Sequence, residues 1–195
     1  MNSLAILDVG YGNTDSIRLG FARLGAEAAL ASDAKQVEGA ERLVIPGVGS
    51  AGFAMARLAE LALVEPLRRR TGPTLGICLG MQLMFDHSEE SDTACLGLVE
   101  GRVRGLSPAP GHPVPHMGWS RLEWVHGEIG LAESDYLYFA HSFACDDGPA
   151  TAARASYGQA SIPAALRSAR LWGAQFHPER SAAAGARFLQ AFLSA

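Results

Sequence analysis

Lysine is almost absent from this sequence, and its absence removes two kinds of chemistry. Lys35 is the only lysine among 195 residues and it follows Ala34, so there is no Gly-Lys-Ser/Thr loop to hold nucleotide phosphates. A lysine that forms a Schiff base is equally unexpected. An excess of basic charge is also lacking, because 16 Lys and Arg against 20 Asp and Glu give a net charge of −4. That balance argues against non-specific binding to nucleic acid or anionic membranes, which needs a basic surface.

Paired cysteines and long apolar runs are missing as well. The three cysteines have no close partner in the sequence, so we expect no disulfide framework and a reducing, cytoplasmic location. The first residues, Met1–Leu4, lack the basic stretch of a signal peptide. No run approaches the roughly 18 apolar residues that a membrane-spanning helix needs. Hydrophobic residues make up 48% of the chain and no linker divides it, so we expect one domain over residues 1–195.

In the first half of the chain, short apolar runs alternate with amphipathic stretches. The expected strands are Leu4–Leu7, Glu27–Leu30, Arg42–Ile45 and Thr74–Ile77. Helices are expected from Asn13, acting as the N-terminal cap, to Leu24, over 50–70 with an interruption at Pro66, and over 81–85. Strands that alternate with helices predict a parallel sheet covered on both faces.

Strand-like segments follow one another in the second half without obvious helices between them. They are Arg102–Leu106, Trp119–Trp124, Tyr136–His141, Thr151–Tyr157 and Arg170–Phe176, and a last helix is expected over Ser181–Leu193. The proline-rich segment Ser107–Pro115 is expected to be a loop. The two halves together predict an α/β fold, with a mixed, mostly parallel central sheet, helices on both faces and an antiparallel extension.

The sharpest local motif is Gly76-Ile-Cys-Leu-Gly80, between an expected strand and an expected helix. A nucleophile at the tip of such a turn has a strained backbone, and glycines two residues away on either side avoid collisions. The amide dipoles at the start of the helix favour a thiolate at Cys78, and the amide of Leu79 would face the attacked carbonyl as an oxyanion donor. Cys78 is therefore the candidate nucleophile. Cys95 and Cys145 lack such a setting and are expected to be buried and inert.

A cysteine nucleophile needs a base, and the base needs a group that orients it. His177 is the best candidate among six histidines because it directly follows an expected strand, and Glu179 can hydrogen-bond its ring. His112 and His116 have the spacing of a metal pair on a helix, but Pro113 and Pro115 forbid that helix, so we expect no metal site.

A glycine-rich loop, Gly47-Val-Gly-Ser-Ala-Gly52, matches the G-x-G-x-x-G pattern of dinucleotide-binding turns. Pro46 stands directly before it, and no later strand ends in an acidic residue at the required distance. A nucleotide-binding module is therefore the weaker interpretation. In the stronger one, a peptide of Gly47, Val48 and Gly49 flips to complete an oxyanion hole beside Cys78.

In its cysteine turn, its His-x-Glu pair and its glycine loop, the chain resembles the class I (triad) glutamine amidotransferases. Finer motifs resemble one branch of that family, the glutaminase subunits of imidazole glycerol phosphate synthases. The motifs are Asp8-Val-Gly-Tyr-Gly-Asn13, Ile45-Pro-Gly-Val-Gly49, Leu75-Gly-Ile-Cys-Leu-Gly-Met-Gln82, Pro115-His-Met-Gly-Trp119, Tyr138-Phe-Ala-His-Ser142 and Gln175-Phe-His-Pro-Glu179. They occur over nearly the whole chain in the family's order. The resemblance implies a single glutamine amidotransferase domain with no cofactor.

The resemblance also implies the chemistry and the site residues. Cys78 would attack the side-chain amide of glutamine to give a γ-glutamyl thioester, His177 would act as acid and base, and Glu179 would orient it. Water would then release glutamate. Gln82, Glu90, Ser142 and Phe143 would hold the amino-acid end of the substrate.

A subunit of this kind is incomplete by itself. The resemblance implies a heterodimer with a (β/α)8-barrel cyclase, which would use the ammonia to make imidazole glycerol phosphate and aminoimidazole carboxamide ribotide in histidine biosynthesis. The residues expected at the interface are Met117, Trp119, Ser120, His141 and Arg180. Ser120, Phe143-Ala144 and Arg180 depart from the residues usual in the family, so a paralogous subunit that supplies ammonia to a different synthase remains the alternative.

Overall fold

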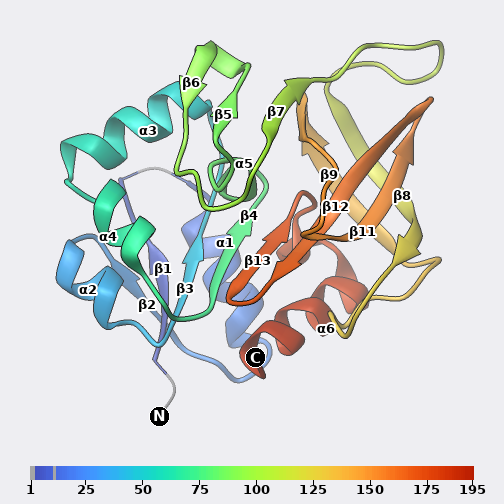
Figure 1. Cartoon of the computed structure of the whole chain (residues 1–195). Coiled ribbons are helices and arrows are strands. Elements are labelled where there is room, and N and C mark those ends of the chain that lie inside the picture. The colour runs from blue at the N-terminus through green and yellow to red at the C-terminus, as the bar shows by residue number, and fades with distance from the viewer. Residues whose placement is uncertain (1–2, 11) are drawn as a thin grey trace.

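The computed structural model describes residues 3–10 and 12–195 (Figure 1). Met1 and Asn2 of the N-terminal stretch and Tyr11 of the first glycine motif lie outside the described residues. The first half of the chain contains β1 (Leu4–Leu7), α1 (Thr14–Ala22), β2 (Ala28–Ala31), α2 (Ala34–Gly39), β3 (Arg42–Ile45), α3 (Ala51–Glu60), α4 (Val64–Arg69), β4 (Thr74–Ile77) and α5 (Leu79–Gln82). The strands expected there are confirmed within a residue at each end.

The second half is built mainly from strands. Its elements are β5 (His87–Ser88), η1 (Glu90–Asp92), β6 (Thr93–Ala94), β7 (Arg102–Gly105), β8 (His116–Val125), β9 (Tyr136–His141), β10 (Phe143–Cys145), β11 (Thr151–Tyr157), β12 (Ala160–Ser168), β13 (Leu171–Ala174), η2 (Pro178–Arg180) and α6 (Ala182–Leu193). Neither β12 nor the short strands β5, β6 and β10 were expected from the sequence.

Most of the described strands belong to one mixed sheet, in the order β2-β1-β3-β4-β13-β12-β11-β8-β9. The strands from β2 to β13 run parallel, whereas β13, β12, β11, β8 and β9 are antiparallel neighbours. A second sheet, β10-β7-β5-β6, stands beside the carboxyl ends of the parallel strands (Figure 1). The expected mixed α/β architecture is confirmed.

Helices cover both faces of the parallel strands because the buried residues alternate in direction. Leu4 and Ile6 pack with α1 and α6 in one core cluster, which also contains a group of T-shaped aromatic contacts around Trp172. Ala5 and Leu7 belong to the opposite cluster, with residues of α2, α3 and α4. The parallel strands are thus held rigidly from both sides, and their carboxyl ends form a fixed platform.

β4 and β13 are hydrogen-bonded neighbours in this platform, with Ile77 opposite Ala174. Cys78 directly follows β4, and His177 follows β13 after two more residues. Because parallel strands present their carboxyl ends at the same edge, this register brings two residues distant in sequence to one place.

Two local expectations were wrong in detail. Asn13 precedes α1, but its side chain forms no capping hydrogen bond to the helix and points elsewhere. The helical segment 50–70 breaks at Ala62, where φ is 54°, whereas Pro66 lies inside the first turn of α4. A proline is tolerated there because the first turn of a helix leaves its N–H groups unpaired in any case.

Within the described residues, no helix is both long and apolar enough to cross a lipid bilayer.

Candidate active site

Cys78 occupies a strained turn between β4 and α5. Its φ and ψ are 52° and −111°, a conformation that non-glycine residues rarely adopt. A Cβ on Gly80 would overlap the carbonyl oxygen of Ile45, and one on Gly76 would overlap the backbone of Gly80. The glycines on both sides are therefore sterically required, and the turn presents the thiol at the start of α5.

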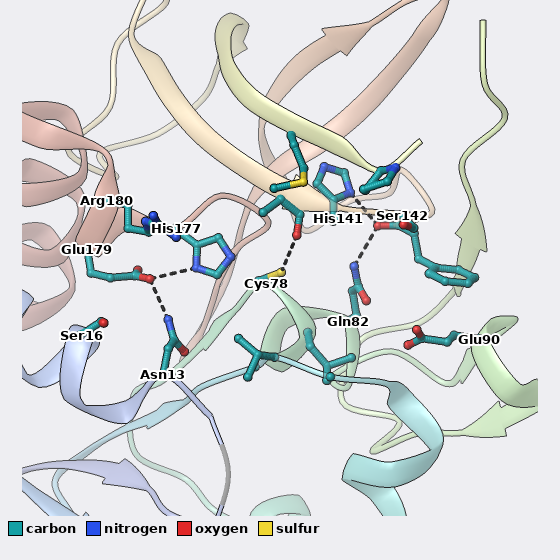
Figure 2. A pocket seen from close by; sticks show the side chains of 18 of the residues that line it. Asn13, Ser16, Cys78, Gln82, Glu90, His141, Ser142, His177, Glu179 and Arg180 are labelled. Atoms are coloured by element: carbon teal, nitrogen blue, oxygen red, sulfur yellow. Dashed lines mark hydrogen bonds and ion pairs between the residues drawn. The ribbon is translucent and has the colours of Figure 1, made fainter. Parts of the chain in front are cut away.

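The thiol faces a cavity of about 740 Å³, which gathers residues from both halves of the chain (Figure 2). Of the residues expected from the sequence, those that line it are Gly47, Val48, Gly49, Cys78, Leu79, Gln82, Glu90, Met117, His141, Ser142, Phe143, His177, Glu179 and Arg180. Further lining residues come from α1 and the positions directly before and after it: Asn13, Ser16, Leu19 and Arg23. Trp119 and Ser120 are outside the lining.

His177 is connected to a buried carboxylate. Its Nδ1 lies 2.9 Å from Oε1 of Glu179, whose side chain is 1% exposed. The amide of Asn13 donates to the same oxygen at 2.7 Å. Because Nδ1 is used by Glu179, Nε2 is the ring atom left for Cys78, and the carboxylate fixes both the tautomer and the orientation of the ring.

The surroundings of His177 act on its pKa in opposite directions. Burial lowers the pKa, whereas hydrogen bonds to Cys78 and Glu179 and the negative charges of both raise it, to about 10 overall. The ring is therefore a cation at neutral pH when its neighbours are ionised. Cys78 and Glu179 thus both favour the protonated form of His177.

A second polar network lies on the other side of the thiol. Gln82 donates from Nε2 to the Phe143 carbonyl at 2.8 Å and to Oε1 of Gln175 at 3.0 Å. Gln175, fully buried, approaches the Cys78 sulfur from Nε2 at 3.8 Å. The thiol itself lies 3.8 Å from the Ala140 carbonyl. Gln82 is thus held in one orientation close to Cys78.

The glycine loop and Glu90 close another side of the cavity. Gly47 packs so tightly on the first residues of α5 that a Cβ there would overlap Leu79 and Gly80. Gly49 has a φ of 98°, which favours glycine, and Val48 is 40% exposed at the rim. Glu90 accepts from the amide of Ala51, the first residue of α3, at 2.7 Å.

The residues expected at a partner interface fall into two groups. Met117 and Trp119 are 64% and 52% exposed, and Arg180 lies over the ring of Tyr138 with its guanidinium carbon 4.9 Å from the centroid. His141 is buried, and Ser120 is half-buried with its hydroxyl on the buried His116 at 2.8 Å. The first group forms an exposed rim; the second lies beneath it.

Asn13, Gln175 and His116 are site residues that the sequence reasoning missed. Asn13 and Gln175 stand inside motifs that carried the family resemblance, but a motif does not tell which member reaches the site. His116 stands inside such a motif as well, and as a single residue it was weighed only as a metal ligand. Cys95 and Cys145 are buried, as expected, and burial raises the pKa of Cys95 to about 11 and that of Cys145 well above its usual range.

Comparisons with known proteins show the family of this chain. The chain is 50% identical over 196 residues to "Imidazole glycerol phosphate synthase subunit HisH" of Xylella fastidiosa (strain Temecula1), covering 99% of this chain and 98% of that protein. The protein of the same name from Xanthomonas campestris pv. campestris (strain 8004) is 47% identical with the same coverage. A solved glutamine amidotransferase matches the fold with a TM-score of 0.77 at 22% identity, over 98% of both chains. Residues 5–195 match the profile "Glutamine amidotransferase class-I". The chain therefore belongs to the class-I glutamine amidotransferase family.

Proposed function

We propose that this chain is the glutaminase subunit of imidazole glycerol phosphate synthase, and that residues 1–195 form one amidotransferase domain. The observation that carries the proposal is the convergence of Cys78, His177 and Glu179 in one cavity on the ends of two adjacent parallel strands. The names of the relatives at 46–50% identity support the choice of synthase.

In the first half of the reaction, the Cys78 thiolate attacks the side-chain carbonyl carbon of glutamine, and the carbonyl oxygen becomes an oxyanion. The carbon–nitrogen bond then breaks as the nitrogen takes a proton from Nε2 of His177, and ammonia leaves. The raised pKa of His177, about 10, supports this role, because the ring carries the proton before the substrate binds. A γ-glutamyl thioester remains on Cys78.

In the second half, His177 takes a proton from a water molecule that attacks the thioester carbonyl. The carbon–sulfur bond breaks, glutamate leaves, and Cys78 and His177 return to the thiolate and imidazolium. Glu179 and Asn13 keep the ring in the orientation that both steps need.

The residues that line the cavity stabilise the oxyanion and bind the substrate in this proposal. The Leu79 amide and an amide of Gly47, Val48 or Gly49 stabilise the oxyanion, a role that the close packing of the glycine loop on α5 supports. Gln82, Glu90 and the backbone of Ser142 and Phe143 hold the amino-acid end of glutamine.

The ammonia passes to a separate cyclase with a (β/α)8 barrel, in a cytoplasmic heterodimer. This partner contacts Met117, Trp119 and Arg180. Ser120 and His141 lie directly behind these three residues. Large apolar side chains exposed at the mouth of a catalytic cavity support an interface there. The partner makes imidazole glycerol phosphate and aminoimidazole carboxamide ribotide. No cofactor is required on this chain.

One alternative is a paralogous subunit that supplies another synthase with ammonia. It stays open because the chain departs from the residues usual in the family at Ser120, Phe143-Ala144 and Arg180. Glutamate release from glutamine separates the two. We expect strong stimulation when the cyclase and its ribulosyl nucleotide are added, and no activity with Cys78→Ala. Hydrolysis that the cyclase does not stimulate favours the paralogue. A Cys78→Ala variant that still releases glutamate contradicts the proposed nucleophile.

A further inference from the structure

Two buried histidines connect Ser120, beneath the exposed rim, to the wall of the cavity. Nε2 of His116 lies 2.8 Å from the Ser120 hydroxyl, and Nδ1 of His116 lies 3.1 Å from Nε2 of His141. Nδ1 of His141 is 2.8 Å from the Phe143 carbonyl. His116 and His141 face each other from adjacent strands, since His116 of β8 is paired with His141 of β9. The result is a continuous chain of hydrogen bonds across the sheet.

The last acceptor, the Phe143 carbonyl, fixes the direction of every hydrogen bond in this series. A carbonyl oxygen can only accept, so Nδ1 of His141 carries the proton. In a neutral ring Nε2 then accepts, which requires Nδ1 of His116 to donate. Nε2 of His116 accepts in turn from the hydroxyl of Ser120. Both ring nitrogens of His116 and both of His141 thus have a hydrogen-bond partner.

Both rings are held in the neutral form. Burial lowers the pKa of His116 and of His141 to about 4, and the positive charge of His177 acts on His141 in the same direction. His116 is stacked between Tyr157, with ring centroids 3.9 Å apart, and Phe139, at 4.8 Å. The aromatic rings prevent His116 from rotating out of line.

The Phe143 carbonyl receives a second hydrogen bond, from Nε2 of Gln82. Its two lone pairs are therefore shared between His141 and Gln82. Because Gln175 takes the other N–H of Gln82, Oε1 of Gln82 is left as an acceptor on the cavity wall, on the side of Glu90 (Figure 2). An amide oxygen and a carboxylate so placed suit the α-ammonium group of an amino acid.

We propose that His141 is a positioning residue for substrate binding. It fixes the Phe143 carbonyl, which orients the Gln82 amide so that Oε1 faces the substrate ammonium. His116 and Ser120 hold His141 in the required tautomer. The inference rests on the proposed glutaminase function and adds residues that do not touch the reacting atoms.

Two substitutions of His141 distinguish its hydrogen bond to the Phe143 carbonyl from its hydrogen bond to His116. In His141→Asn the side-chain N–H takes the place of Nδ1 and can still donate to Phe143, whereas in His141→Gln the amide reaches towards His116 instead. We expect His141→Gln to raise the KM for glutamine about tenfold in the complex with the cyclase, with kcat changed less than about twofold. His141→Asn should restore KM to within about threefold of wild type.

His126→Gln, at an exposed histidine, is the matched control and should leave KM unchanged. Equal KM values for the two His141 variants, or a higher KM for His141→Asn, would overturn the proposal. A loss confined to kcat would do so as well. Wild type without any glutaminase activity would instead refute the underlying function.

A measurement on the wild-type chain avoids the risk that a variant fails to fold. Nitrogen NMR of histidine labelled in the ring distinguishes the two neutral tautomers. At neutral pH we expect both His116 and His141 as the neutral form protonated at Nδ1. A charged His141, or one protonated at Nε2, contradicts the chain of hydrogen bonds and with it the positioning role.

Discussion

At the scale of single residues, the histidine of the site is a cation before the substrate arrives. Burial opposes a charge on His177, but Cys78 and Glu179 outweigh burial and raise its pKa to about 10. In the proposed mechanism, the proton that ammonia needs to leave is thus already in place at neutral pH. The cost of burying the charge is offset by two anionic neighbours rather than by solvent.

The contribution of the thiolate can be tested with Cys78→Ser. A neutral hydroxyl does not supply the charge that raises the pKa of His177, whereas burial continues to lower it. We therefore expect the His177 ring to lose its proton at a lower pH in the variant than in wild type, where the pKa is about 10. NMR titration of the ring measures both, with the exposed His126 as an internal reference. An unchanged titration of His177 would show that Cys78 does not act on it.

The sequence predicts the proposed triad but not the residues that support it. Cys78, His177 and Glu179 stand in short motifs whose local geometry has chemical meaning. Asn13 reaches Glu179 across 166 positions of the chain, and Gln175 reaches Cys78 across 97. His141, expected at an interface, is turned inward by a partner 25 residues away. Such contacts depend on the register of strands, which no local pattern encodes.

At the scale of elements, the turn after β4 is the most tightly constrained part of the fold. Gly80 lies against the backbone of Ile45, and Gly47 of the glycine loop lies against Leu79. The first residues of α5, which directly follow Cys78, and the proposed oxyanion loop are thus packed directly on each other. A methyl group at either glycine would separate them.

Gly80→Ala tests this close approach. The obstacle is backbone rather than a flexible side chain, so we expect the free energy of unfolding to fall by about 3 kcal/mol or more. Gly39→Ala, at the end of α2 with no atom within 4 Å of the added Cβ, is the matched control and should change stability by less than about 1 kcal/mol. Urea unfolding of both variants gives the comparison. A Gly80→Ala variant as stable as wild type would refute the packing argument.

Regular elements were easier to predict than irregular ones. The buried parallel strands are continuous apolar runs, and α6 has a clear helical pattern, so both were expected from the sequence. β5 and β6 have two residues each, too few for any periodicity. β12 contains Pro163 within an alanine-rich stretch, a composition that does not favour a strand.

At the scale of the whole molecule, the mouth of the cavity is surrounded by exposed apolar side chains. Leu19, Val48 and Met117 line it and are between 40% and 64% exposed, and Trp119 stands next to them on β8. Trp119 packs edge-on against Tyr138, which Arg180 covers from another side. A rim that combines exposed apolar side chains, an aromatic anchor and arginine has the composition of a protein interface.

Trp119→Ala tests this rim. We expect the affinity for the cyclase to fall about 30-fold or more, as at interface hot spots, while the free energy of unfolding changes by about 1 kcal/mol or less. Leu30→Ala, at an exposed leucine on the edge strand β2, should leave binding unchanged. Titration calorimetry and thermal unfolding measure the two quantities. Unaltered cyclase binding by Trp119→Ala would remove Trp119 from the interface.

The central claim is that Cys78, and no other cysteine, is the nucleophile for glutamine. A glutamine analogue with a reactive diazoketone in place of the side-chain amide, added to the complex with the cyclase, reports this directly by peptide mass spectrometry. We predict one covalent adduct, on Cys78, that free glutamine competes away, and no adduct on the buried Cys95 or Cys145. An adduct on either of those two, or an unmodified Cys78 in a complex that hydrolyses glutamine, would contradict the account.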